Sequence, residues 1–477
     1  MNIWGVSAGG HDASLAILKN NELVFASQTE RFSRHKNDKY LNKDIINYGF
    51  SYGYPDVIMW YEKPHKRFLR KLIYDREFKY FNPKKYLNKL GLYSKIYFCN
   101  HHDSHAAASL YTYGGNAENS LIFVFDAVGE FDCISSYRVI NNKLSVIDKV
   151  KYPNSLGLFY TCITDLLGFK ANEDEYIIMG MASYGDAERY YSKLSDIFFK
   201  EELNLNFYLN RGCRGIFSEK ELDLYKFDIA AATQKIYEDK LISYIKRVLC
   251  KNKASKIMLG GGCSLNCTAN SKILNLVNDI HIFPHPGDGG ASVGSALLYK
   301  QNKIDFKNAF LGYKESSILN VSSMIKAISQ EGFCFSINEK AEFGPRALGN
   351  RSILADPRAR GMQNKINDLK GRELFRPFAP CILKEYFSEY FDTLGLTESP
   401  YMQYTFKCKK PDLIPATVHI DGTSRVQTVD KNNPLLYKLL KEWYKQTGCP
   451  ALLNTSLNVK GKPLLNSRYD LREFDIN

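Results

Sequence analysis

The sequence predicts an α/β protein whose N-terminal domain contains a duplicated unit and is followed by a separate C-terminal domain. A strand–turn–strand–turn–strand pattern occurs twice in the N-terminal third of the chain. Beyond residue 230, helical segments alternate with short apolar strands, which is typical of an α/β protein. Near residues 310–320 the pattern starts again, and we therefore expect a second domain there.

The duplicated unit covers residues 2–28 and 120–149. Its first copy consists of the strands NIWGVS, ASLAILK and ELVFAS, with Asn20-Asn21 in the second turn. The other copy consists of SLIFVFD, CISSYRVI and KLSVIDK, with Asn141-Asn142 in the equivalent place. Each Asn pair lies between alternating or apolar strands and predicts a hairpin. The repeat indicates a duplicated domain, and the alternative is two unrelated hairpins.

The remaining elements follow from apolar periodicity and turn residues. A helix is expected over residues 230–251, and strands are expected over 256–262 and 279–284. In the C-terminal part, SSMIKAISQ predicts a helix and GFCFSIN predicts the strand after it. No low-complexity linker marks the boundary, and we place it between the domains 1–315 and 316–477.

The composition excludes several classes of protein. The chain has 477 residues, of which 44 % are hydrophobic and 24 % charged, so wholesale disorder is excluded. No run of about 18 apolar residues occurs, and we expect no membrane partner. The N-terminus lacks a basic region before its apolar stretch and is not typical of a secretory signal. Eleven scattered cysteines predict reduced thiols in a cytoplasmic protein.

Positive charge is concentrated in one stretch of the chain. The net charge is +13, and eleven basic residues lie between Lys63 and Lys95 against only two acidic ones. Seven aromatic residues are interleaved with them. Cations that bind phosphates and rings that stack on bases together indicate a nucleic-acid surface. The alternative is a solvated helical face whose aromatic rings pack inward.

A metal site is indicated by the segment NHHDSHAAAS. His101 and His105 are four residues apart, so a helix would direct both imidazoles to one side, whereas His102 would face away. Asp126 ends the apolar strand LIFVF, and Asp288 lies in the glycine-rich turn FPHPGDGGASVG. Two His and two Asp suit Fe(II) or Zn(II). The alternative is that the histidines are hydrogen-bonded groups of the core.

An anion pocket is indicated in the C-terminal domain. Its basic residues stand beside Gly, Pro or aromatic residues instead of acidic partners, a pattern that suits bidentate binding of phosphate. Neutral donors follow in the segment LLNTSLN, and surface arginines are the alternative. The basic residues are Arg346, Arg351, Lys370, Arg372, Arg376 and Arg425, and the neutral donors are Asn454, Thr455, Ser456 and Asn458.

Three glycine-rich stretches each follow an apolar strand: VSAGGHDAS, LGGGCSLNC and PGDGGASVGSA. Their backbone amides could hold phosphate, although none of the three is a Walker A sequence. Cys263 and Cys267 lack the spacing of zinc ligands, and we expect them to be packed thiols.

Taken in order along the chain, these motifs resemble the O-carbamoyltransferase family of nodulation-factor and antibiotic biosynthesis. The resemblance covers nearly the whole sequence, and its longest string is highly specific. The motifs are GHDAS, ERFSRHK, HHDSHAAAS, FDAVGE, DIAAATQ, GGCSLNC, PGDGGASVG, EFGPRALGNRSILADPR, FRPFAP, DGTSRVQT and NTSLN.

The resemblance implies a fold for each domain. The N-terminal domain is expected to have the duplicated actin/Hsp70-like fold, similar to the metal-binding protein of tRNA threonylcarbamoyladenosine synthesis. The C-terminal domain is expected to be an α+β domain similar to the carbamoyladenylate-forming protein of that pathway. Family members continue past LLNTSLN through a further helix and strand, whereas this chain ends at Asn477, so we expect a shortened C-terminal domain.

The resemblance also implies an activity. In such enzymes the C-terminal domain makes carbamoyladenylate and pyrophosphate from carbamoyl phosphate and ATP, which requires Mg²⁺. The N-terminal metal site then transfers the carbamoyl group to a substrate hydroxyl. By resemblance, the metal ligands are His101, His105, Asp126 and Asp288. Carbamoyl phosphate and the adenylate are expected to bind Arg346, Lys370, Arg376, Arg425, Asn454 and Ser456.

His11 is the candidate general base for the acceptor hydroxyl, because it is the titratable group in the first glycine turn. Asp12, Lys36 and Asp228 are weaker candidates for contacts to the acceptor.

The family motifs do not specify the acceptor. The basic stretch favours an anionic acceptor, such as the hydroxymethyl group of a modified pyrimidine in DNA or a nucleotide. The alternative is a sugar hydroxyl in a surface glycan or natural product, which is the common acceptor of the family. Threonylcarbamoyl-type modification of tRNA, or a non-catalytic nucleic-acid-binding protein, are further alternatives. The first usually has its two domains on separate chains, and the second would not need both sites.

Overall fold

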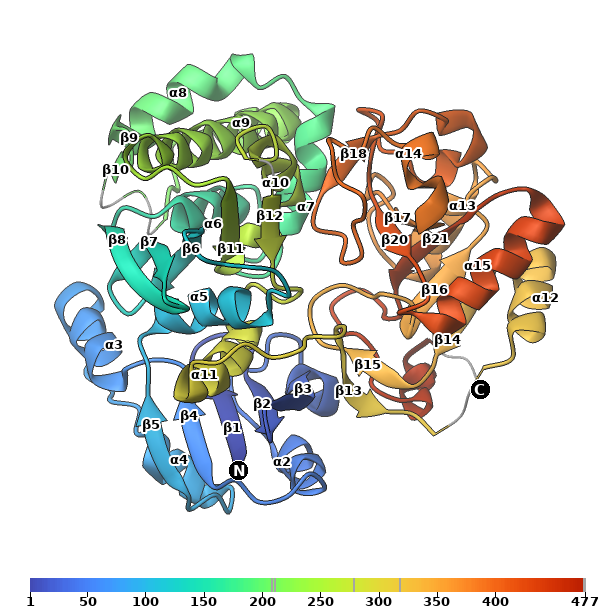
Figure 1. Ribbon diagram of the computed structural model, residues 1–477. Helices are drawn as coiled ribbons and strands as arrows, with labels where there is room; N and C mark the ends of the chain where they lie inside the picture. Colours follow the sequence, from blue (N-terminus) through green and yellow to red (C-terminus); the bar gives the residue numbers. More distant parts are fainter. Residues whose placement is uncertain (207–208, 210–211, 278, 317–318, 475–477) are drawn as a thin grey trace. The chain divides into compact units, whose positions relative to one another are not determined.

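The computed structural model describes residues 1–206, 209, 212–277, 279–316 and 319–474 (Figure 1). The chain forms two compact units. The first unit comprises Met1–Phe25 and Lys39–Phe306, and the second comprises Ala26–Asp38 and Lys307–Asn477. The boundary expected at 315/316 stays a prediction of the sequence.

The first unit contains two five-stranded sheets with the same strand order. In each, an antiparallel meander of three strands is extended by two parallel strands from its first strand. The shared order confirms the duplicated, actin/Hsp70-like α/β fold. The first sheet has the order β3 (Glu22–Gln28), β2 (Ser14–Lys19), β1 (Asn2–Ser7), β4 (Val57–Trp60) and β5 (Lys95–Phe98). The second has the order β8 (Lys143–Lys151), β7 (Asp132–Ile140), β6 (Leu121–Gly129), β11 (Lys256–Gly260) and β12 (Asp279–Ile282).

The Asn pairs form the second turn of each meander. Asn20 and Asn21 have φ of 51° and 68°, and Asn141 and Asn142 have φ of 51° and 57°. This left-handed backbone matches the twist of the flanking strands, and Asn adopts it at low cost. The predicted hairpins are therefore confirmed.

Two helices, α5 (His101–Thr112) and α11 (Ala291–Lys300), lie between the two sheets of the first unit (Figure 1). Helix α11 packs on β1, β2 and β4, and α5 packs on β6 and β11. The long helix α9 (Glu219–Lys251) includes the predicted helical segment. The other helical segments of this unit are α2 (Lys43–Phe50), α3 (Pro64–Arg70), η1 (Lys71–Asp75), α4 (Pro83–Lys89), α6 (Leu156–Leu166), α7 (Glu175–Met181), η2 (Ala182–Tyr184), α8 (Glu188–Phe198), η4 (Gly262–Leu265), α10 (Cys267–Ile273) and η5 (Asp288–Gly290). Strands β9 (Phe199–Glu201) and β10 (Asn204–Leu205) form a small separate sheet.

The second unit is built on one five-stranded mixed sheet with an apolar cluster on each face. One cluster joins the sheet to α12 (Val321–Glu331) and α15 (Pro434–Thr447), and the other joins it to α13 (Met362–Leu369). Helix α12 and the strand after it confirm two predicted elements. The sheet order is β14 (Phe333–Ile337), β16 (Arg351–Ala355), β21 (Ala451–Ser456), β17 (Ala379–Leu383) and β20 (Gln427–Val429). Smaller elements are β13 (Phe310–Lys314), β15 (Lys340–Glu342), η6 (Lys384–Tyr386), α14 (Phe387–Tyr390), β18 (Thr405–Lys407), η7 (Pro411–Leu413), η8 (Pro415–Thr417), β19 (Thr423–Arg425) and η9 (Arg468–Phe474).

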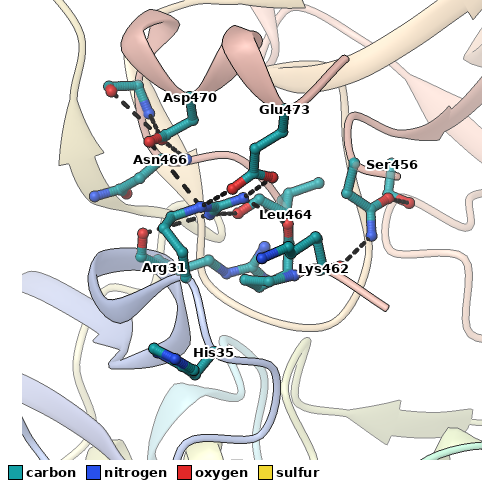
Figure 2. A network of polar contacts seen from close by, with 12 residues as sticks. Arg31, His35, Ser456, Lys462, Leu464, Asn466, Asp470 and Glu473 are labelled. Atoms are coloured by element: carbon teal, nitrogen blue, oxygen red, sulfur yellow. Dashed lines mark hydrogen bonds and ion pairs between the residues drawn. The ribbon is translucent and has the colours of Figure 1, made fainter. Parts of the chain in front are cut away.

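A short segment near the N-terminus, Ala26–Asp38, belongs to the second unit and contains α1 (Glu30–Ser33). The Arg34 guanidinium donates to both carboxylate oxygens of Glu473, at 3.0 and 2.9 Å. It also donates to the Leu464 carbonyl at 2.7 Å. Figure 2 shows Glu473 and Leu464 beside the segment that carries Arg31 and His35. The motif ERFSRHK therefore anchors the last helical turn of the chain.

No helix among the described residues combines the length and the apolar character that a membrane span requires. All eleven cysteines are free, and only Cys250 is exposed.

The contact between β1 and α11 requires glycine at position 5. A Cβ there would lie 1.8 Å from the Ser292 carbonyl oxygen, which is backbone and has no rotamer to change. We predict that Gly5→Ala lowers the free energy of unfolding by about 1–3 kcal/mol, the usual cost of overpacking. Urea denaturation followed by circular dichroism measures it. Gly114→Ala is the control, because nothing lies within 4 Å of its Cβ position, and equal stability of the two variants would contradict the prediction.

Candidate active site

Four side chains of the first unit meet at one point. They are His101, His105, Asp126 and Asp288, and one ligand atom from each lies within 4.8 Å of all the others. The two histidine Nε2 atoms are 3.1 Å apart. His101 Nε2 lies 3.0 Å from Asp126 Oδ2 and 3.4 Å from Asp288 Oδ1. The sequence thus identified four residues that the fold brings together.

Three elements position this cluster. His101 and His105 lie one turn apart on α5, as their spacing predicted. Asp126 lies on β6 where the pairing with β7 shifts register between Phe125 and Gly129, and such an irregularity redirects a side chain. Asp288 begins the short helical turn η5. A Cβ at Gly129 would lie 2.3 Å from the His101 ring, so the strand approaches α5 closely only because this residue is glycine.

The cluster is buried and its charges compensate one another. Burial raises the pKa of Asp288, but the charge and hydrogen bond of His101 outweigh it and hold that pKa well below its usual value. The pKa of Asp126 is also lowered, because its hydrogen bond to His101 acts against burial. Conversely, burial lowers the pKa of His101, and the two carboxylates raise it well above normal. Both carboxylates therefore remain ionised at neutral pH.

This donor set fits a divalent cation. The two imidazole nitrogens and two carboxylate oxygens face one centre from three different elements. His101 Nε2 lies within 3.0 Å of Asp126 Oδ2 and 3.4 Å of Asp288 Oδ1, so both carboxylates face the same ring nitrogen. Mixed nitrogen and oxygen donors suit Fe(II) or Zn(II).

The adjacent His102 does not join the cluster. It is buried, and its Nδ1 lies 2.7 Å from the Ser135 hydroxyl on β7. The His102 side chain therefore faces away from the four candidate metal ligands, as the sequence predicted.

His11 and Asp12 lie in the turn between β1 and β2. His11 Nδ1 is 3.0 Å from Asp12 Oδ2. His11 Nε2 and Asp12 Oδ1 are buried, and the backbone of Asn172 also acts on the His11 ring. Burial lowers the pKa of His11, but Asp12 and the charge of Asp288 raise it to about 9. The ring is thus protonated at neutral pH in the metal-free protein, whereas a general base needs the neutral ring.

The other two weaker acceptor candidates, Asp228 and Lys36, lie in other surroundings. Asp228 on α9 accepts a hydrogen bond from the Asp186 amide at 2.8 Å and pairs with Arg189 at 2.8 Å. Its carboxylate therefore holds the turn before α8. Lys36 is half-buried in the segment Ala26–Asp38 of the second unit. Contacts of Asp228 and Lys36 to an acceptor stay predictions.

Lys370 is the centre of a polar cluster in the second unit. It follows α13 and is 3 % exposed. Its Nζ donates to the carbonyl oxygens of Ser456 and Asn458, the latter at 2.7 Å, and to Asn458 Oδ1 at 2.9 Å. Burial lowers the pKa of Lys370, and the charges of Arg372 and Arg376 lower it further. The loop after β21 is therefore attached to the end of α13.

The other predicted anion ligands lie at different depths in the second unit. Arg376 pairs with Glu373 at 3.2 Å, and Asn454 donates to the Ala347 carbonyl at 3.2 Å. Arg346 is half-buried in the same loop as Ala347. Arg425 ends β19, and no described residue accepts a hydrogen bond from its buried Nε. The structure thus joins Lys370, Ser456 and Asn458 directly, whereas the roles of Arg346, Arg376, Arg425 and Asn454 stay predictions.

Arg351 is not part of an exposed anion pocket, contrary to the sequence analysis. Its side chain is fully buried in β16. The guanidinium donates only to backbone carbonyls among the described residues, including Asn466 at 2.8 Å and Asn338 at 2.6 Å. All its donors are used by these carbonyls. The guanidinium thus joins β16 to the loops around it and is not available for phosphate.

Sequence reasoning missed a polar network beneath the glycine-rich loop 259–267. The side-chain amides of Gln234 and Asn266 form two mutual hydrogen bonds of 3.0 and 2.9 Å. Gln234 also donates to Glu238 and accepts from the Tyr160 hydroxyl, both at 2.8 Å. Asn266 caps α10 through the Ala269 amide. The only signal in the sequence was a Gln one turn before a Glu on an apolar helix, which also suits an exposed pair.

Two family models match the chain. Carbamoyltransferase N-terminus matches residues 65–297, and carbamoyltransferase C-terminus matches residues 325–475. The chain belongs to the carbamoyltransferase family. It is therefore an enzyme that transfers carbamoyl groups, as the resemblance of its motifs predicted.

Relatives of known name support this membership. Nodulation protein NolO of Bradyrhizobium diazoefficiens is 31 % identical over 78 % of this chain and 75 % of its own length. Nodulation protein NolNO of Sinorhizobium fredii is 28 % identical over 96 % of this chain and 76 % of its own. An uncharacterized protein of Synechocystis is 30 % identical and is covered over 93 % of its length.

Similar solved structures match the carbamoyltransferase only distantly. Component A of the (R)-2-hydroxyglutaryl-CoA dehydratase of Acidaminococcus fermentans has a TM-score of 0.38 at 12 % identity, covering 63 % of this chain and 98 % of that one. A ROK family glucokinase of Streptomyces griseus has a TM-score of 0.35 at 13 % identity, covering 63 % of this chain and 100 % of that one. The fold assignment rests on the strand order instead.

The metal site can be tested without an activity assay. We predict that His105→Ala weakens binding of Fe(II) or Zn(II) by at least about 100-fold, since loss of an outer partner alone costs 10- to 100-fold. Metal content after dialysis and isothermal titration calorimetry measure this loss. The matched control is His102→Gln on the same helix, which leaves all four ligands in place. Equal metal affinity of the two variants would exclude this cluster as the metal site.

The structural role of Arg351 can be tested by measuring stability. We expect Arg351→Ala to lower the stability of the second unit by about 3–5 kcal/mol, because it leaves a cavity and several buried carbonyls without donors. Hydrogen exchange of peptides from β16 and β21 in increasing urea measures this change. Arg360→Ala is the control, since the side chain is 84 % exposed and should contribute less than about 0.5 kcal/mol. Unchanged protection in Arg351→Ala would refute the role.

Proposed function

We propose that this carbamoyltransferase makes carbamoyladenylate in its second unit and transfers the carbamoyl group to a hydroxyl in its first unit. The observation that carries the proposal is the buried cluster of His101, His105, Asp126 and Asp288, whose ligand atoms lie within 4.8 Å of one another. The protein's membership of the carbamoyltransferase family identifies the transferred group as carbamoyl.

The second unit supplies the charge that two anionic substrates need. Carbamoyl phosphate is first hydrolysed to carbamate and inorganic phosphate. An oxygen of the carbamate then attacks the α-phosphorus of ATP, and pyrophosphate leaves. Both steps gather negative charge, which fixed cations and Mg²⁺ stabilise. Lys370, Arg376 and Arg425 are proposed to bind these phosphates, with Arg346, Asn454 and Ser456 around them. Lys370 donates its three N–H groups to Ser456 and Asn458, so binding of a phosphate requires it to exchange at least one of these hydrogen bonds for a phosphate oxygen.

The first unit is proposed to carry out the transfer. The acceptor oxygen attacks the carbamoyl carbon, AMP leaves with the electron pair of the broken C–O bond, and the hydroxyl proton goes to His11. Because the charge of Asp288 helps to raise the pKa of His11, a cation bound to Asp288 would lower that pKa and so favour the neutral ring that a general base needs. A divalent cation held by the four ligands would supply positive charge for an oxygen of the carbamoyl or phosphate group. Asp12 holds His11 Nδ1 at 3.0 Å, which leaves Nε2 as the nitrogen that would take the acceptor proton.

For the acceptor we propose a sugar hydroxyl. The stretch from Lys63 to Lys95 is only partly available to a nucleic acid, because many of its groups are used within the protein. Arg67 pairs with Glu62 at 2.9 Å, and Lys66 lies 3.8 Å from Glu130. The rings of Tyr74, Phe81 and Tyr86 pack against other aromatic residues of the unit. A hydroxymethyl group in DNA or a nucleotide stays a prediction of the sequence.

The two half-reactions can be separated by two variants. We expect Lys370→Ala to reduce ATP–pyrophosphate exchange with carbamoyl phosphate by about 100-fold or more, because a buried phosphate-binding cation is lost. His105→Ala should retain this exchange and lose transfer to the acceptor. Lys365→Ala on α13, the helix that Lys370 follows, is the control. Loss of exchange in His105→Ala and its retention in Lys370→Ala would contradict the assignment of the two units.

The acceptor is identified by mass spectrometry with ATP, carbamoyl phosphate, Mg²⁺ and Fe(II). A panel of sugars is compared with hydroxymethylcytosine DNA and its free nucleotide. A mass increase of one carbamoyl group on a sugar, with the DNA unchanged, is the expected result. Carbamoylated base in the DNA digest would replace the sugar proposal by the nucleic-acid acceptor.

A further inference from the structure

The segment from Leu69 to Lys89 exposes apolar side chains that the proposed reaction does not use. Phe78 is 78 % exposed, Ile73 57 %, Tyr80 49 % and Leu69 48 %. They come from the end of α3, from η1 and from the extended segment before α4. We call these four residues the apolar ridge. Exposed large side chains are ordinary when scattered singly, whereas four within twelve residues are a local concentration of exposed apolar side chains.

Three aromatic contacts attach the segment that carries the apolar ridge to the rest of the first unit. The ring of Phe68 packs edge-on against Tyr80 with centroids 5.6 Å apart, and Tyr74 packs against Tyr152 at 4.9 Å. Phe81 packs against Trp60, whose side chain is fully buried. Because these inward-facing rings attach the segment to the first unit, the exposed side chains are held outward. Tyr80 thus keeps a ring contact with Phe68, while all four ridge side chains remain about half exposed or more.

The same segment is positively charged. Seven basic and two acidic residues lie between Leu69 and Lys89. Both acids are neutralised within the segment, since Asp75 pairs with Arg70 and Glu77 pairs with Lys71. Within the described part of the chain, no ion pair involves the other five basic residues. These five, all exposed, are Arg76, Lys79, Lys84, Lys85 and Lys89.

We propose that the apolar ridge and these five basic residues dock the enzyme on the surface of an anionic lipid bilayer. Leu69, Ile73 and Phe78 enter the boundary of the acyl chains, and Tyr80 lies at the headgroup level, where its ring and hydroxyl are both accommodated. The basic side chains contact anionic headgroups. The first unit is then held at a membrane surface by this segment.

Two other occupants suit the surface less well. A nucleic acid matches the basic residues and could stack on Phe78 or Tyr80, but Leu69 and Ile73 have no ring to stack on a base. A second copy of the chain would place like charges against each other in a two-fold interface, which is unfavourable. A lipid surface uses both the aliphatic residues and the cations.

The experiment is co-sedimentation of the full chain with vesicles. Wild-type protein is expected to bind phosphatidylcholine vesicles that contain about one third phosphatidylserine, and to bind pure phosphatidylcholine at least about tenfold less. The double variant Ile73→Ser/Phe78→Ser should lower binding by about tenfold or more, because two apolar insertions are lost. Lys84→Glu/Lys85→Glu should lower it by a similar factor through the charge alone.

Matched controls come from the same unit. Leu224→Ser changes a leucine that is 62 % exposed on α9, and Lys251→Glu/Lys253→Glu reverses two exposed charges elsewhere. Both should bind anionic vesicles like wild type. Thermal unfolding of every variant verifies folding, and exposed substitutions should leave the transition temperature nearly unchanged. If the serine variant does not fold, the Lys84/Lys85 variant carries the test.

Three results would overturn the proposal. One is wild-type protein that does not bind anionic vesicles, and another is equal binding by the ridge variants and their controls. The third is binding of a DNA duplex, or self-association in sedimentation, that the ridge variants abolish while vesicle binding is absent. None of these results depends on the acceptor screen, so docking and the proposed reaction can fail independently.

Discussion

The close approach of α5 and α11 is the constraint on which the site of this carbamoyltransferase depends. A Cβ at Gly294 on α11 would lie 1.7 Å from the carbonyl oxygen of Ser104 on α5, so the two backbones touch there. Because α11 carries η5 and Asp288 at its start, this contact sets the distance between Asp288 and the histidines of α5. A larger residue at Gly294 would push α11 away from α5 and so move Asp288 away from His101 and His105.

The two units compensate their buried charges in different ways. In the first, buried carboxylates and imidazoles face one another, and the arrangement leaves room for a cation in their midst. In the second, the buried cations Lys370 and Arg351 are surrounded by backbone carbonyls and side-chain oxygens. A carbonyl group carries only a partial charge, so it satisfies the donors without neutralising the cation. Burial lowers the pKa of Arg351, and the charges of the buried carboxylates Glu342 and Glu315 partly offset this effect.

Prediction from the sequence was most successful where a side chain's neighbours are close in the chain. The Asn-Asn hairpins and the His101–His105 pair depend on φ values and on a spacing of four residues, which are local properties. Asp126 and Asp288 were identified as well, because a carboxylate at the end of an apolar strand or in a glycine turn is conspicuous. Arg351 was assigned to the wrong environment, since a buried guanidinium and a phosphate-binding one have the same flanking residues. The pairing of Gln234 with Asn266 spans 32 residues and had no local signal.

The sequence by itself determined the α/β class, the duplicated topology, the family and the four candidate metal ligands. These follow from hydrophobic periodicity, turn residues and the order of the motifs, which are all properties of the linear sequence. Only the tertiary structure decided that the segment Ala26–Asp38 joins the second unit and that Arg351 is enclosed by carbonyls. It also decided which aromatic residues of the basic stretch face inward and which form the apolar ridge. The physical reason is that the burial of a side chain depends on residues distant in sequence. Residue type alone does not specify which of these residues pack against it.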